Sequence, residues 1–111
     1  MNKDDVVICD LTVRAGSEYV VDIDYTDDDE VSIDMTGWTV ESQIREFVES
    51  IQAIEFETSA DETGIHMSLD KETTKQLRFA RGVYDVFITD NMGNRTKLME
   101  GHVDVIGGVT R

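Results

Sequence analysis

The densest group of side chains that could do chemistry is a run of carboxylates between residues 22 and 30. Carboxylate oxygens at this density suit a hard cation such as Ca²⁺. The run lacks the central glycine and the twelfth-position glutamate of an EF-hand, so we favour a solvated loop over a metal site. A docking surface for a basic partner is a further use of the same charges. The six residues are Asp22, Asp24, Asp27, Asp28, Asp29 and Glu30.

The other reactive side chains are scattered along the sequence. His66 and His102 have no neighbouring histidine or cysteine at ligand spacing, whereas zinc requires three or four clustered nitrogen or sulfur ligands. No serine lies in a GxSxG nucleophile elbow, and the glycine pair at 107–108 precedes no helix that could bind a phosphate. We therefore expect a protein that is not an enzyme and that uses no cofactor.

Composition restricts the partners that the chain can have. Its 111 residues correspond to a single domain, 1–111, and 10 Lys and Arg against 24 Asp and Glu give a formal charge of −14. Such a charge repels nucleic-acid phosphates and anionic lipids, so we expect neither nucleic acid nor membrane as a partner. The single cysteine, Cys9, cannot form an internal disulfide bond, and no signal peptide opens the sequence. These features indicate folding in a reducing cytoplasm.

The elements that must position these residues are short strands, because apolar and polar side chains alternate in seven blocks. A short helical turn is expected at 70–77, with Asp70 as its N-cap, and Gly101 marks a possible bulge inside the last strand. The pattern predicts an all-β, immunoglobulin-like antiparallel β-sandwich of about seven strands with one short helical turn in a crossover. Residues 106–111 are expected to form a flexible or docking tail. The expected strands are 6–13, 18–25, 38–45, 51–58, 64–69, 83–89 and 96–105.

Three residues are expected to hold the sandwich together. Gly82 and Tyr84 follow the helical turn in the manner of a tyrosine corner, in which the tyrosine hydroxyl group bonds to the backbone of the preceding crossover. Trp38 begins a strand after a glycine turn, and we favour a place in the core over a place at an interface. These assignments are structural and imply no chemistry.

The candidate interface combines one aromatic side chain with charged and terminal segments. Phe87 falls on the polar face of its strand, between Asp85 and Thr89, which favours contact with another chain. The acidic loop and the end of the chain complete the predicted docking set. Its members are Phe87, Asp27, Asp28, Asp29, Val109 and Arg111.

Several blocks of the sequence resemble a family of small β-sandwich proteins from tailed bacteriophages. The blocks are a charged turn at 14–19, a hydrophobic-Thr-Gly-aromatic strand entry at 34–40, an acidic helical turn at 69–74, a Gly-x-Tyr-x-hydrophobic strand at 82–90 and a hydrophobic-Glu-Gly segment at 98–101. In this respect the chain is similar to the N-terminal domain of the phage baseplate upper protein. The similarity extends over nearly the whole domain, but the long trimerising helix of that protein does not follow here.

The resemblance implies a non-enzymatic structural component of a bacteriophage virion, an adaptor in the tail, baseplate or neck that works by protein–protein docking. Its partners would be other virion proteins, in multiple symmetric copies, and its location the virion after synthesis in the host cytoplasm. Two alternatives stay open at this point. One is a capsid decoration protein on the head exterior, and the other is an acidic DNA-mimic inhibitor of a host protein.

Overall fold

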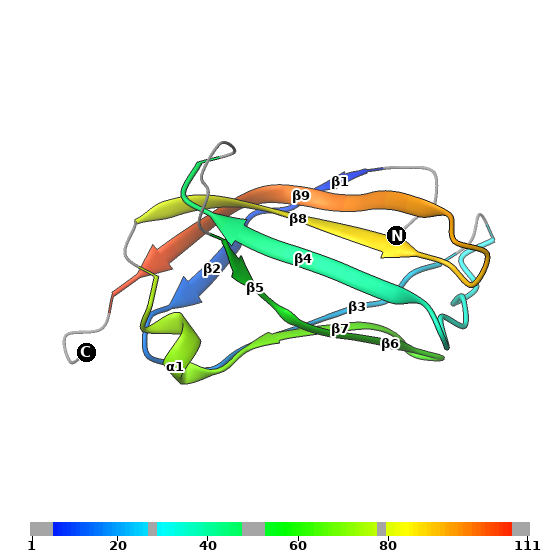
Figure 1. The fold of residues 1–111 in the computed structure, drawn as a ribbon, viewed down its shortest axis with the longest axis horizontal. Helices are drawn as coiled ribbons and strands as arrows, with labels where there is room; N and C mark the ends of the chain where they lie inside the picture. The colour runs from blue at the N-terminus through cyan, green and yellow to red at the C-terminus, as the bar shows by residue number, and fades with distance from the viewer. Residues whose placement is uncertain (1–5, 27–28, 48–52, 78–79, 108–111) are drawn as a thin grey trace.

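The computed structural model describes residues 6–26, 29–47, 53–77 and 80–107. Figure 1 shows two layers of strands, with one short helix at the left end in the connection from the lower layer to the upper one. The strands are β1 (Val7–Ile8), β2 (Leu11–Arg14), β3 (Tyr19–Ile23), β4 (Thr39–Arg45), β5 (Ile54–Glu55), β6 (Glu57–Asp61), β7 (Gly64–Leu69), β8 (Arg81–Thr89) and β9 (Arg95–Ile106), and the helix is α1 (Lys71–Thr74).

The strands form two sheets that pack face to face. The larger sheet has the order β1-β9-β8-β4-β5, with β2 also paired to β9, and the smaller sheet has the order β3-β7-β6. This division of strands is that of an immunoglobulin-like sandwich, so the predicted fold class is confirmed. The expectation of purely antiparallel pairing was wrong at one edge, because β1 and β2 both run parallel to β9.

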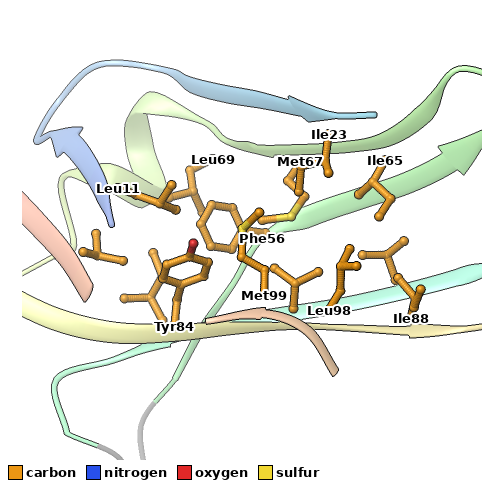
Figure 2. Close-up of a cluster of buried hydrophobic side chains, with 14 of the residues drawn as sticks. Leu11, Ile23, Phe56, Ile65, Met67, Leu69, Tyr84, Ile88, Leu98 and Met99 are labelled. Carbon is orange, nitrogen blue, oxygen red and sulfur yellow. The ribbon is translucent and has the colours of Figure 1, made fainter. Parts of the chain in front are cut away.

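The core lies between the sheets and is built from alternate positions of each strand (Figure 2). The inward side chains of β7 are Ile65, Met67 and Leu69, and none of them is more than 1% exposed. The alternation breaks in β9, where both Leu98 and Met99 are buried. A register shift opposite Val86 and Phe87 accommodates the extra residue as a β-bulge. The bulge therefore lies at Leu98. The sequence had suggested Gly101, and that expectation was wrong.

Hydrogen bonds connect the two sheets along one long side of the sandwich. The predicted strand 51–58 is divided at Phe56, where the chain passes from the larger sheet to the smaller one. The backbone N–H of Phe56 donates to the carbonyl oxygen of Ser42 at 3.0 Å, and the Thr58 hydroxyl group donates to that of Val40 at 2.8 Å. Because Ser42 and Val40 belong to β4, these bonds connect the two layers.

The predicted strand 6–13 is also divided, and its interruption at Cys9 and Asp10 has a physical cause. β1 and β2 keep one register on β9, with Val7 opposite Met99 and Leu11 opposite Val103. A Cβ atom added to Gly101 would lie 2.2 Å from the carbonyl oxygen of Cys9, so glycine alone permits this approach. The Asp10 carboxylate accepts the N–H of His102 at 2.9 Å in place of a strand carbonyl group.

The Cys9 carbonyl oxygen turns toward the core and accepts the hydroxyl group of Tyr84 at 2.5 Å. Tyr84 lies directly opposite Gly101 on β8 and is 4% exposed, so its ring crosses the glycine to reach Cys9. Burial raises the pKa of this hydroxyl group, which therefore stays a donor. The sequence predicted a bond to the preceding crossover; the structure corrects the partner to the interrupted first strand, 75 residues away.

The helical turn fixes the connection between the two sheets. Asp70 caps α1 by accepting the backbone N–H of Thr73 at 2.7 Å, as predicted for an N-cap. Thr74 is fully buried, and its hydroxyl group donates to the carbonyl oxygen of Ser17 at 2.9 Å and accepts from the N–H of Gly16 at 3.0 Å. The turn between β2 and β3 is thereby held in place by a side chain from α1.

We predict that Tyr84→Phe lowers the free energy of unfolding by about 1–2 kcal/mol, because the Cys9 carbonyl group loses its buried donor. Chemical denaturation measures the effect. Tyr19→Phe is the matched control, since the Tyr19 ring packs against Phe56 while no hydrogen bond of its hydroxyl group is found among the described residues. Equal losses in the two variants would contradict the assignment.

We predict that Gly101→Ala costs about 2–3 kcal/mol, since the new methyl group overlaps the backbone of Cys9 and the strand must move. Amide hydrogen exchange should show that protection is lost first in β1. The loss in the double variant Gly101→Ala/Tyr84→Phe should be smaller than the sum of the single losses, because both changes break the same contact. Strict additivity would show that the two residues act separately.

Candidate functional site

The outer face of the larger sheet carries a groove of about 520 Å³ that lies over β4, β8, β9 and β1. Phe87 of β8 lines it and is half-buried, although it belongs to the solvent-facing row of its strand. The bulge at Leu98 shapes this face, because the alternation changes phase there. As a result Arg95 and Lys97 before the bulge and Glu100 after it all line the groove.

Two cations lie near the half-buried Phe87 ring. The guanidinium carbon of Arg95 lies 3.8 Å from the centre of the Phe87 ring, and the Lys97 Nζ atom lies 5.8 Å from it. A cation over an aromatic face contributes about 0.5–1 kcal/mol at an exposed site. The ring is therefore held in position by its neighbours on β9 while it lines the groove.

Charges of both signs balance within the groove. Arg95 Nε is 3.4 Å from Glu41 Oε1, and Lys97 Nζ is 3.1 Å from Glu100 Oε1. The ionised groups of the lining are three basic and three acidic side chains, which sum to zero with His102 neutral, in a chain whose total is −14. An acidic protein can approach this face without the repulsion that the net charge of the chain exerts elsewhere. The six are Arg45, Arg95, Lys97, Glu41, Asp85 and Glu100.

The predicted acidic run does not converge on one point in the described residues. The Asp24 carboxylate accepts the hydroxyl group of Ser32 at 2.9 Å, and Asp29 and Glu30 are exposed on the following turn. Asp27 and Asp28 lie outside the described residues. Within the part of the chain that the structure describes, no three His, Cys, Asp or Glu side chains gather in a way that could hold a metal ion.

Asp22 instead joins a cluster that sequence reasoning missed, on the outer face of the smaller sheet. His66 Nδ1 is 2.7 Å from Asp22 Oδ1, and His66 Nε2 is 3.1 Å from Asp61 Oδ1. Asp22 stands opposite His66 in the β3–β7 ladder, so only knowledge of the register could have revealed the pair. The Thr63 hydroxyl group donates to Asp61 at 2.6 Å.

Hydrogen bonds govern the ionisation of this cluster. Those from His66 to Asp22 and to Asp61 raise the pKa of the imidazole, since the charged form is the better donor. Side-chain and backbone hydrogen bonds from Thr63, followed by that of His66, lower the pKa of Asp61 to about 2. Both ring nitrogens are engaged and the Thr63 hydroxyl group is bonded to a carboxylate. The Thr63 Oγ1 atom also lies 3.0 Å from His66 Nε2. The arrangement is that of an electrostatic clamp between β3, β7 and the end of β6.

The remaining predicted residues are placed as follows. Trp38 is half-buried and packs edge-on against Tyr25, with ring centres 6.2 Å apart. Gly82 is buried within β8, opposite Val103 and two residues before Tyr84 on the same strand. Val109 and Arg111 lie outside the described residues.

The two sheets define an all-β, immunoglobulin-like sandwich domain, and the groove lies on the outer face of the larger sheet. No family model and no curated protein matches the sequence. Among solved structures, the chain is similar to one described as murine CRIg, with 9% sequence identity, coverage of 89% of this chain and 92% of that one, and a TM-score of 0.43. In the described part of the chain, α1 with its four residues is too short to cross a membrane.

We predict that the free energy of unfolding falls as the pH rises above about 6.5, the usual pKa of histidine. The pKa of His66 is raised in the folded state, so His66 stabilises the fold below that pH, and this stabilisation is lost as the pH rises through the raised pKa. The unfolding free energy measured from pH 5.5 to 8.5 should decline in the native chain and decline less in His66→Gln. His102→Gln on the other sheet is the control and should retain the decline. An unchanged slope in His66→Gln would contradict the clamp.

Proposed function

We propose that this chain is a non-enzymatic structural component of a bacteriophage virion, an adaptor of the tail, baseplate or neck that docks onto other virion proteins through the outer face of its larger sheet. The resemblance of short sequence blocks to small phage β-sandwich proteins supports the class. The groove around Phe87 supports the mode of action. The partners would be other virion proteins present in several symmetric copies.

The observation that carries this proposal is the charge-balanced groove that Phe87 lines. Interface hot spots are typically aromatic or Arg side chains that partly desolvated surroundings hold in place, and Phe87 under Arg95 has that form. A ring fixed before binding loses little conformational entropy when a partner covers it. The balanced ion pairs around it would set the register of docking.

A capsid decoration protein on the head exterior would dock through the same face. Only its location in the particle would distinguish it from an adaptor of the tail, baseplate or neck. Mass spectrometry of purified phage particles should recover this chain, and a particle reconstruction would then place it on the tail or on the head. Its absence from purified particles would overturn the proposal. Recovery with a basic nucleic-acid-binding host protein, with steep salt dependence, would favour the DNA-mimic alternative.

We predict that Phe87→Glu reduces incorporation into particles by about tenfold or more, as expected when an aromatic anchor is lost. The new carboxylate can pair with Arg95, so the domain should keep its fold and its melting temperature within a few degrees. Met92→Glu is the matched control, because Met92 is an 86% exposed apolar residue on the β8–β9 turn, outside the groove lining. Competition between tagged copies during assembly measures the ratio. Equal incorporation of both variants would exclude the groove as the docking site.

A further inference from the structure

The two sheets are connected along one long side of the sandwich and end in separate edge strands along the other. On one side, β5 and β6 carry the chain between the layers, and Phe56 and Thr58 bond to β4. On the opposite side, β1 ends the larger sheet and β3 ends the smaller one. Among the described residues no hydrogen bond joins β1 to β3, and β3 pairs with β7 alone.

Apolar side chains are incompletely covered along this second side. Val7 and Cys9 from the larger sheet and Tyr19 and Val21 from β3 pack against the core, yet all four are only half-buried. We call these four residues the open seam. The inward side chains of the neighbouring strand β7 are at most 1% exposed by comparison. On the outer face of β3, Val20 is 56% exposed.

The backbone of β3 is equally open. In an antiparallel ladder every second residue directs its N–H and C=O groups away from its partner, so the edge of β3 offers unpaired donors and acceptors. Natural edges are usually blocked by proline, a lysine or a bulge. The chain contains no proline, β3 contains no lysine, and its pairing with β7 is regular from Tyr19 to Ile23.

Charge selects what can bind at this edge. None of the residues of β3, β6 and β7 is Lys or Arg. Glu18 and Asp24 flank β3, and Asp22 projects from its outer face, where His66 of β7 is its basic partner among the described residues. A second copy of this chain would bring the same carboxylates against themselves, which disfavours self-pairing. A segment with Lys or Arg on its outward face complements the edge.

We infer that β3 accepts an extended, basic segment of another protein as a fourth strand of the smaller sheet. Backbone hydrogen bonds to β3 would supply affinity. Alternate apolar side chains of the incoming segment would cover the open seam, and alternate basic side chains would face Glu18 and Asp22. This surface is separate from the groove of the proposed function, so either can fail without the other.

The test uses an eight-residue peptide of alternating valine and lysine, titrated into the full chain by calorimetry. A first control peptide carries N-methyl groups on its four central residues, which block both of its edges and keep every side chain. A second replaces each lysine by glutamate. We expect both controls to bind at least about tenfold more weakly, and amide resonances of 19–23 to shift most with the parent peptide.

A pair of variants tests the same edge from the side of the protein. Val20→Lys places a cation on the outer face of β3 and should weaken binding about tenfold or more, whereas Met92→Lys adds the same charge to an exposed apolar residue elsewhere and should not. Removal of residues 1–5 should leave binding unchanged. Equal binding of the N-methylated peptide, shifts confined to other strands, tighter binding after that removal or no binding at all would overturn the inference.

Discussion

The architecture depends on one close contact, the passage of the Cys9 carbonyl group over Gly101 to the hydroxyl group of Tyr84. This contact holds the first segment of the chain on β9, in the larger sheet. Because that segment is committed to β9, it cannot pair with β3, and the smaller sheet is left with three strands. The same contact therefore completes one layer of the sandwich and leaves the edge of the other without a neighbour.

Charge is sorted between the two layers. The strand-borne Lys and Arg side chains all belong to the larger sheet, where they are interleaved with carboxylates, while the smaller sheet has only a histidine clamped between two aspartates. A molecule with a total charge of −14 thus has one face that is locally neutral and one that is acidic. Such a molecule meets its partners in a preferred orientation, because the long-range field turns the acidic face away from anionic surfaces.

The sequence alone was enough for the class of fold and for strands with clean alternation, such as 64–69, since period-two patterning depends on local burial. The sequence did not reveal that the predicted strand 51–58 is divided at Phe56. A buried apolar residue has the same local pattern whether the chain passes to the other sheet there or continues in one strand. The bulge at Leu98 was misplaced because two adjacent apolar residues leave the phase ambiguous. The Asp22–His66–Asp61 cluster depends on register across 44 residues of sequence, which no local pattern encodes. Phe87 could be singled out from the sequence because an aromatic residue on a polar row is a local signal, and its place at an interface stays a prediction.

The parallel pairing of β1 and β2 with β9 also has a mechanical meaning. Both partners run in the same direction, with Val7 beside Met99 and Arg14 beside Ile106. Tension applied between residue 6 and residue 107 would slide the strands along each other and load the hydrogen bonds of this ladder in shear. Bonds loaded in this way must rupture together instead of opening one by one. If this domain were attached at these two ends to proteins that move apart, it would therefore resist extension until all the hydrogen bonds of the ladder break.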